Sequence, residues 1–144
     1  MLVMVLVFGM SVIGCPNDDN STNGNGGDKS LNGTWDSQEA GGISYTFDNG
    51  NFQATMSGLL YAKGTYKAES GKITTTITHY HGQTLRESYP ALELKWYSKS
   101  DLKTLLPNED FDPAFQTSTS NYSISGSTLS FTSDGYTMKF TKRS

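Results

Sequence analysis

The sequence predicts an all-β domain, an antiparallel up-and-down meander of about eight or nine strands with one short helix. The first reason is composition: the 144 residues include 15 Gly, 8 Tyr and 7 Phe, and Ser, Thr and Asn are also frequent. This balance favours strands and turns over helices. The second reason is a series of two-residue turn signals between segments of alternating polarity. The third is that these turns, taken as hairpin centres, put the apolar residues of successive strands on one face.

The chain opens with "MLVMVLVFGMSVI", residues 1–13, an apolar run without charge. It is shorter than the roughly 20 residues that a membrane-spanning helix needs and has the length of the apolar region of a secretory signal peptide. Val12-Ile13-Gly14-Cys15 then resembles the bacterial lipoprotein lipobox. That resemblance implies cleavage before Cys15 and a diacylglycerol linked to its sulfur. We therefore expect a signal peptide at 1–14 and a lipidated Cys15, the single cysteine of the chain.

Residues 16–30, "PNDDNSTNGNGGDKS", contain no large apolar side chain. Such a segment buries too little surface to offset the entropy lost on ordering, so we expect a flexible tether at 15–30. A Gly-rich coil of this length extends over roughly 20 Å. The expected organisation is a lipid anchor in the membrane of the bacterial cell envelope, on the periplasmic face or the cell surface, followed by one domain at 31–144.

Two hairpins are predicted in the first half of the domain. Asn49-Gly50 is the strongest two-residue turn signal, because both central residues of a type I′ turn need positive φ. A hairpin centred there pairs Phe47 with Phe52, Tyr45 with Ala54 and Ile43 with Met56. Ser70-Gly71 centres a second hairpin, which pairs Ala68 with Ile73, Tyr66 with Thr75 and Gly64 with Ile77. A shift of one residue would expose half of the apolar set.

Residues 91–107 interrupt this rhythm. In "ALELKWY", Leu92, Leu94 and Trp96 alternate with polar residues, which predicts a strand. Ser98 to Asp101 then provides a helix start, and Pro107 ends the one or two turns that follow. We expect a loop over 108–118.

Two further turns, Gly126-Ser127 and Asp134-Gly135, organise the last three strands. The hairpins they centre pair Ile124 with Leu129, Tyr122 with Phe131, Phe131 with Met138 and Leu129 with Phe140. Because Leu129 and Phe131 face the same way in both hairpins, the three strands share an apolar face. A sheet of this size with one apolar face must either close into a barrel or pack on a second sheet as a β-sandwich.

Several segments, in this order, resemble the small lipocalin-like (calycin-type) domains of bacterial lipoproteins: "LNGTWDS", "YTFDNGNFQATM", "GTYKAESGKITTTI", "YSISGSTLSF" and "YTMKFTKRS". The resemblance covers most of residues 31–142 and favours the barrel over the sandwich. Gly33-Thr34-Trp35 matches the Gly-x-Trp of the first lipocalin strand. The resemblance implies that Trp35 plugs the closed end of the barrel and that Lys142 or Arg143 covers it.

The same resemblance implies a binder of a small apolar ligand. Strand parity selects the candidate ligand-binding residues on the inward face, and small residues at 54, 62 and 64 are expected to leave room there. These candidates are Tyr45, Phe47, Ala54, Met56, Ala62, Gly64, Tyr66 and Phe131. We expect the pocket to open at the end away from Trp35. The alternative is a filled barrel that serves as a protein–protein interaction or structural surface module.

Other classes of function find little support in the sequence. The formal charge of −3 argues against nucleic acid as a partner. There is no nucleophile elbow, no phosphate-binding Gly loop and no spaced carboxylate pair, so we expect no enzyme and no catalytic residue. His79 and His81 share a strand face without a third ligand, which indicates a solvated rim. The acidic run at 108–112 lacks the spacing of a calcium loop. We expect neither metal nor cofactor.

Overall fold

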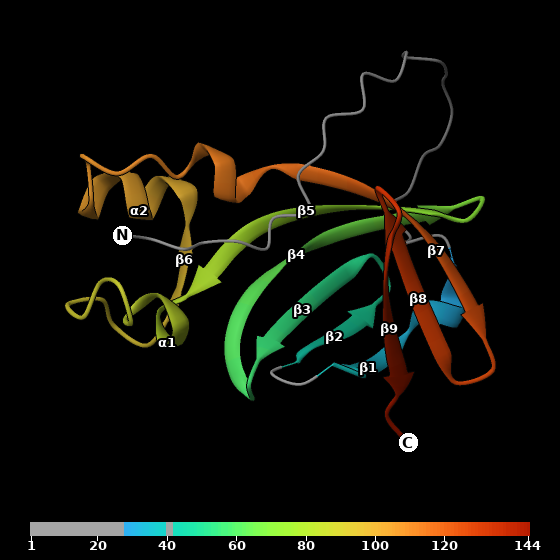
Figure 1. The fold of residues 1–144 in the computed structure, drawn as a ribbon. Helices are drawn as coiled ribbons and strands as arrows, with labels where there is room; N and C mark the ends of the chain where they lie inside the picture. The colour runs from blue at the N-terminus through green and yellow to red at the C-terminus, as the bar shows by residue number, and fades with distance from the viewer. Residues whose placement is uncertain (1–27, 40–41) are drawn as a thin grey trace, which may run out of the picture.

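The computed structural model describes residues 28–39 and 42–144 (Figure 1). The expected signal peptide, the lipidation site at Cys15 and the tether up to residue 27 lie outside these residues. The described part begins with a short 3-10 helix, η1 (Lys29–Leu31), whose N-cap Asp28 accepts a hydrogen bond from the Tyr122 hydroxyl at 2.7 Å. Residues 28–30, expected in the tether, therefore pack against the domain. Among the described helices, none has the length and apolarity to cross a bilayer.

Eight strands of the described chain close into an antiparallel barrel. They are β1 (Gly33–Ser37), β2 (Ile43–Asp48), β3 (Asn51–Met56), β4 (Leu59–Glu69), β5 (Lys72–His81), β7 (Thr117–Ser125), β8 (Thr128–Ser133) and β9 (Tyr136–Lys142). Each strand pairs with the next, and β9 returns to β1 through Trp35↔Lys142 and Asp36↔Thr141. Pairing of the first and last strands confirms the predicted barrel and excludes the β-sandwich.

The hairpin registers predicted from the turn residues are confirmed. Asn49 and Gly50 have φ values of 44° and 89°, as a type I′ turn requires. The observed cross-strand partners include Phe47↔Phe52, Tyr45↔Ala54, Ala68↔Ile73, Gly64↔Ile77, Ile124↔Leu129, Phe131↔Met138 and Leu129↔Phe140. Local turn chemistry therefore decides which side chains of each strand face the interior.

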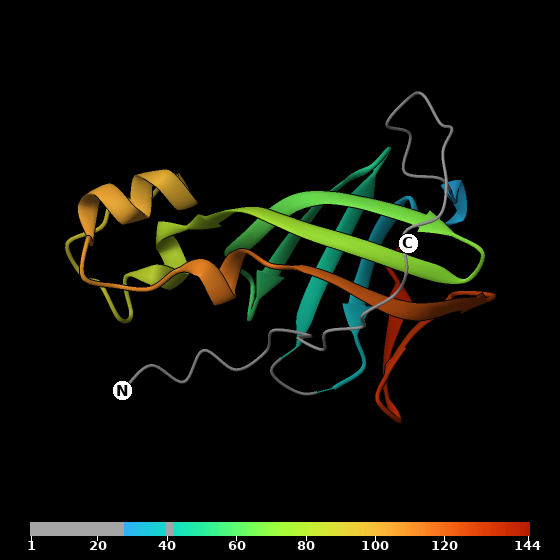
Figure 2. The same ribbon diagram turned by 90° about the horizontal axis from the view of Figure 1, so that it is seen from above.

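Strands β4 and β5 are the longest, with 11 and 10 residues, and they project beyond the barrel (Figure 2). One edge of β5 is shared by two partners. Its first half, Lys72–Thr76, pairs with β7, whereas His79–His81 pairs with the short strand β6 (Trp96–Ser98). The segment between β5 and β7 therefore packs against the projecting ends of β4 and β5. We call this segment, residues 82–116, the insertion.

The insertion contains α1 (Gly82–Leu85), β6, α2 (Lys99–Leu105) and the 3-10 helix η2 (Asp112–Phe115). The predicted helix is confirmed as α2, which begins with a capping box between Ser98 and Asp101. The strand predicted through 91–97 is wrong before Trp96: Leu92 is buried, but Leu94 is 62% exposed. Only His79–His81 of β5 pair with β6. The residues just before Trp96 therefore have no strand partner and form turns and bends. The loop expected at 108–118 contains η2 and the start of β7.

Two hydrophobic clusters make up the core of the described residues. The first fills the barrel beside η1 and includes Leu31, Trp35, Phe47, Tyr66, Leu129 and Phe140. The second joins the insertion to the projecting strands and includes Ala62, Tyr80, Leu85, Tyr97, Leu102 and Ala114. The candidate site uses residues of both clusters.

Candidate ligand-binding cavity

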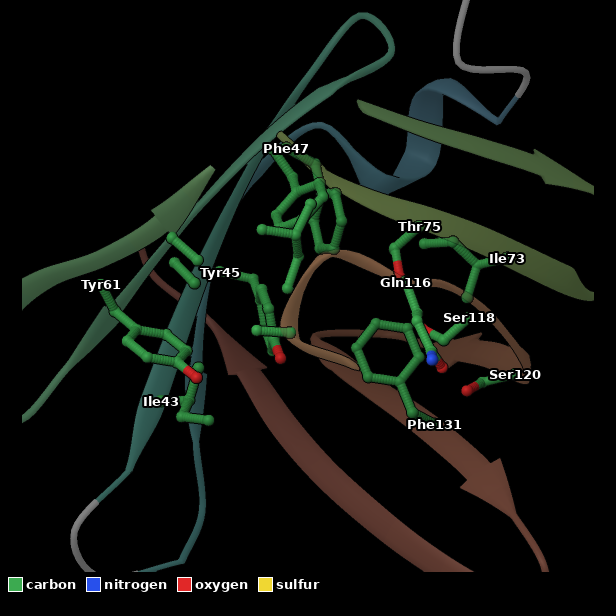
Figure 3. Close-up of a pocket in the computed structure, with 15 residues that line it drawn as sticks. Ile43, Tyr45, Phe47, Tyr61, Ile73, Thr75, Gln116, Ser118, Ser120 and Phe131 are labelled. Atoms are coloured by element: carbon green, nitrogen blue, oxygen red, sulfur yellow. The ribbon is translucent and has the colours of Figure 1, made fainter. Parts of the chain in front are cut away.

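A cavity of about 80 Å³, partly open to solvent, lies inside the barrel. Strands β2 and β3 supply an apolar wall of Ile43, Tyr45, Phe47, Phe52 and Ala54. Further apolar residues come from β4, β5, η2 and β8: Tyr61, Ala62, Ile73, Ile77, Ala114 and Phe131. The remaining residues are polar and uncharged: Thr75, Gln116, Ser118 and Ser120. Figure 3 shows labelled side chains from both walls pointing into the same space.

The structure brings five of the eight predicted ligand-binding residues onto the cavity wall: Tyr45, Phe47, Ala54, Ala62 and Phe131. Their common orientation follows from the confirmed registers, because Tyr45, Ala54 and Ala62 are successive cross-strand partners. The other three, Met56, Gly64 and Tyr66, do not line the cavity.

Tyr66 and Met56 lie outside the cavity for different reasons. The Tyr66 ring packs edge-on against Phe47, with centroids 4.9 Å apart, and its hydroxyl donates to Asn32 Oδ1 at 3.3 Å. Tyr66 therefore belongs to the filled core beside η1. Met56 keeps its predicted pairing with Ile43 at the end of β3, but it is not among the residues that line the cavity. The β-bulge at this level lies in β4, where Tyr61 is the extra residue between the partners of Ala54 and Thr55, and Tyr61 and Ala62 both line the cavity.

The expectation that Gly64 leaves room in the barrel is wrong. A Cβ on Gly64 would overlap the carbonyl oxygen of Thr76 on the neighbouring strand. The β4–β5 ladder is irregular between Lys63 and Gly64, where the two backbones come together. Glycine is needed here for close backbone approach rather than for an empty volume.

The polar wall was missed by the sequence analysis. Ser118 and Ser120 are half-buried, in phase with the half-buried Tyr122 and Ile124 of the same strand. Extending the alternation back from Ile124 would have found them. A loop was expected over 108–118, and the predicted strand pairings of this region reach back only to Tyr122, so neither serine was predicted to face inward.

Tyr45 lies among aromatic rings at the centre of the apolar wall. Its ring centroid is 5.5 Å from that of Phe140, 5.8 Å from that of Phe47 and 6.1 Å from that of Phe131. Burial raises the pKa of the Tyr45 hydroxyl to about 12, with a smaller contribution from Tyr61. The hydroxyl is therefore neutral at physiological pH. Tyr45 is half-buried and lines the partly open cavity, and no side-chain hydrogen bond of its hydroxyl is found within the described residues.

Trp35 packs against η1 at the seam between β1 and β9. This residue has no solvent exposure, and its Nε1 donates to the Leu31 carbonyl oxygen at 2.7 Å. Lys142 Nζ lies 5.1 Å from the centre of the indole ring. Gly33 has φ of +121°, and a Cβ there would lie 3.0 Å from Lys142 Cε. The three residues thus form one packed unit.

Arg143 has a different partner from Lys142. Its Nε and Nη2 donate to the two carboxylate oxygens of Asp36, at 2.9 and 2.6 Å. Ser44 Oγ donates to Asp36 Oδ1 at 2.6 Å. The hydrogen bonds from Arg143 and then Ser44 lower the pKa of Asp36 below its ordinary value of 3.8. This network links β1, β2 and the end of the chain on the outer surface of the barrel.

The insertion supplies part of the cavity wall. The Tyr80 hydroxyl donates to the Ala114 carbonyl oxygen at 2.6 Å, and the Tyr80 ring packs edge-on against Phe115 with centroids 5.1 Å apart. These contacts hold η2 against β5, which places Ala114 and Gln116 on the cavity wall. The site is therefore shared between the barrel and the insertion.

The histidine pair is divided between two structural roles. His81 Nδ1 accepts a hydrogen bond from the Gln83 N–H at 3.0 Å, and its ring packs on Trp96. Burial, and then the charge of Lys63, lower the pKa of His81 below 6.5. His79 Nδ1 lies 2.9 Å from the Thr78 hydroxyl. The described residues contain no group of three or more His, Cys, Asp or Glu suited to a metal ion.

The acidic segment 108–112 is engaged by lysines of α2. Asp112 Oδ1 lies 2.8 Å from Lys99 Nζ and 2.9 Å from Lys103 Nζ, and the hydrogen bonds from the two ammonium groups lower the pKa of Asp112 to about 2. Glu109 accepts a hydrogen bond from the Tyr89 hydroxyl at 3.2 Å. These contacts tie the segment to the rest of the insertion.

Comparison with known proteins adds one structural likeness. No protein-family model matches the chain, and no curated protein matches it. Among solved structures, an uncharacterized protein from Bacteroides eggerthii DSM 20697, solved at 2.60 Å resolution, is 18% identical with a TM-score of 0.44. The match covers 78% of this chain and 99% of that chain.

Proposed function

We propose that this protein is a lipid-anchored binding protein of the bacterial cell envelope, whose barrel takes up a small, largely apolar molecule. The single observation that carries the proposal is the interior cavity, which is partly open to solvent and is lined mostly by aromatic and aliphatic side chains. Concave, mostly apolar cavities with a few placed polar groups are typical of small-molecule sites. A role in binding rather than in catalysis suits this wall, which has no charged residue.

The anchor is proposed from the sequence alone. The apolar run at 1–13 and the lipobox-like Val12-Ile13-Gly14-Cys15 support export and lipidation of Cys15. The polar residues after Cys15 would hold the barrel away from the bilayer on a tether. The binding site would then face the aqueous side of the membrane rather than the lipid.

The volume of the cavity limits the size of the ligand. A water molecule needs roughly 10–15 Å³ of such space, so about 80 Å³ holds roughly five to eight waters. Sites for drug-sized ligands have volumes of about 300–1,000 Å³. The proposed ligand is therefore a small ring or short chain, or the end of a longer molecule whose remainder leaves through the opening.

The test is binding of small apolar probes to the parent protein and to a variant with a filled cavity. We expect xenon and toluene to shift the NMR signals of Tyr45 and Phe131. Ala54→Leu adds volume at a cavity-lining position and should abolish these shifts. The variant should still fold, because the added side chain occupies empty space and does not overpack the core. Ala91→Leu, at an exposed position of the insertion, is the matched control and should bind like the parent.

Native mass spectrometry of the protein from its own membranes provides a second readout. We expect a small molecule to remain bound to the parent protein and to be missing from Ala54→Leu. If neither probe binds and no molecule is retained, the binding function is wrong. A barrel that serves as scaffold for protein–protein contacts would then be the better account.

A further inference from the structure

The two sides of the cavity differ in chemistry. Rings and aliphatic side chains of β2, β3 and β8 form one side, with Tyr45, Phe47 and Phe131 among them. The other side carries four polar residues from β5, η2–β7 and β7, which we call the polar strip: Thr75, Gln116, Ser118 and Ser120. In Figure 3 the labelled residues of the strip lie together, across the cavity from Tyr45. An occupant therefore meets apolar surface on one side and hydrogen-bonding groups on the other.

Several polar groups of the cavity have no protein partner within the described residues. In the strip, Thr75 and Ser118 are engaged with each other, with their hydroxyl oxygens 3.0 Å apart. The side chains of Ser120 and Gln116 make no hydrogen bond to the described chain, and neither does the Tyr45 hydroxyl. Gln116 is exposed, Ser120 and Tyr45 are half-buried, and no fully buried side-chain N or O atom of the described residues lacks a hydrogen-bond partner. These three side chains are thus available to an occupant.

The cavity contains no charge that could balance an ionised ligand. None of its 15 lining residues is acidic or basic. Moving a carboxylate or an ammonium group from water into such a space is strongly unfavourable unless an opposite charge meets it. The Tyr45 hydroxyl is protonated at neutral pH, like an ordinary tyrosine, and burial raises its pKa further, so this group can both donate and accept a hydrogen bond.

We propose that the cavity selects a small neutral molecule with an apolar body and a hydroxyl group, such as a phenol or a short alcohol. Tyr45 and Ser120 are the specificity-determining residues for that hydroxyl. The inference rests on the proposed binding function and adds the chemical class of the ligand. A hydroxyl suits the site because it both donates and accepts, and the free groups of the cavity include hydroxyls and an amide.

The experiment compares three probes of the same shape: toluene, p-cresol and p-toluate. Their dissociation constants are measured by NMR titration on the full domain. We expect p-cresol to bind about three- to tenfold more tightly than toluene, the gain of one hydrogen bond. We expect p-toluate, which is anionic at neutral pH, to bind more weakly than either.

Two hydroxyl deletions then test the assigned residues. Tyr45→Phe and Ser120→Ala each remove one oxygen and should each remove part of the roughly three- to tenfold p-cresol preference while toluene binding is kept. The matched controls lie on the outer surface: Tyr136→Phe, at a side chain 54% exposed, and Ser123→Ala, on the outward face of β7. Both controls should keep the preference of the parent.

The outcomes separate this inference from the function on which it rests. If toluene and p-cresol bind equally, or if both deletions leave the preference unchanged, the inference is wrong while the binding function stands. If p-toluate binds most tightly, the proposed neutral class is wrong. If no probe binds to the parent protein, the binding function itself fails.

Discussion

The ammonium group of Lys142 lies 5.1 Å from the centre of the Trp35 ring, and the two residues are cross-strand partners at the seam between β1 and β9. A cation over an indole face contributes roughly 0.5–2 kcal/mol. The Trp35 Nε1 also bonds the Leu31 carbonyl oxygen, which ties η1 to the same seam. One aromatic side chain thus joins the beginning and the end of the described domain.

Trp35→Ala should lower the free energy of unfolding by about 3–5 kcal/mol, the range for a large core aromatic. The cause is the loss of a fully buried ring together with its contacts to Leu31 and Lys142. Urea unfolding followed by circular dichroism measures the effect. Trp96→Ala, at a partly exposed site of the insertion, should cost less. A Trp35 variant as stable as the parent would contradict the assigned role.

Gly64→Ala should destabilise the barrel strongly, because its methyl group would overlap the Thr76 carbonyl oxygen of β5. A backbone atom cannot move aside without breaking the β4–β5 ladder. Gly58→Ala is the matched control: its φ of +79° carries strain, but nothing lies within 4 Å of the added Cβ. We expect the control to cost about 1 kcal/mol. Thermal unfolding of both variants checks the order, and equal melting temperatures would disprove the close approach.

His81 should make the domain less stable in mild acid. Its pKa in the folded protein is lowered, first by burial and then by the charge of Lys63. The unfolded chain, with an ordinary histidine pKa near 6.5, therefore binds the proton more readily. The contribution is present in full above about pH 6.5 and is lost as the pH falls toward the lowered pKa.

The measurement is urea unfolding at several pH values between 5 and 8 for the parent protein and for His81→Asn. Asn keeps an N-cap acceptor for the Gln83 N–H but does not titrate. The variant should lose part of the pH dependence. If both proteins respond to pH alike, His81 does not contribute.

Cys15→Ser should leave the precursor uncleaved and without lipid, because the serine hydroxyl cannot form the thioether. Growth with radioactive palmitate followed by gel analysis measures lipidation, and the mobility of the band reports cleavage. Ser11→Ala, four residues before the cysteine and outside the lipobox-like segment, should be processed like the parent. Label retained in Cys15→Ser would refute the proposed anchor.

The strand registers are the part of the fold that could be predicted in detail from the sequence. Asn49-Gly50 and Ser70-Gly71 are local signals, since the positive φ they allow depends on two neighbouring residues. Once such a turn is placed, every side chain of the hairpin can be assigned to a face of the sheet, because successive side chains along a strand point to opposite faces. This is why Tyr45, Ala54 and Phe131 could be placed on the inner face.

The same rule fails where one strand meets another irregularly. The bulge at Tyr61 of β4 adds that side chain to the cavity wall beside Ala62, and the close approach of β5 removes the space expected beside Gly64. Both features depend on how adjacent strands twist and slip in the closed barrel. The strand expected over 91–97 forms only from Trp96 onward for a similar reason. Only His79–His81 of β5 are free to pair with it, because β7 occupies the first half of the same edge.

By itself, the sequence determined an all-β chain, its hairpin registers, the helix capped by Ser98 and the inward direction of the aromatic residues. Each of these depends on neighbours within a few positions. Only the tertiary structure decided that the sheet closes through Trp35 and Lys142, that the insertion reaches the cavity through Tyr80 and Ala114, and that a polar strip faces Tyr45. These features join residues far apart in the chain, and their geometry follows from barrel closure, which local turn and strand preferences do not specify.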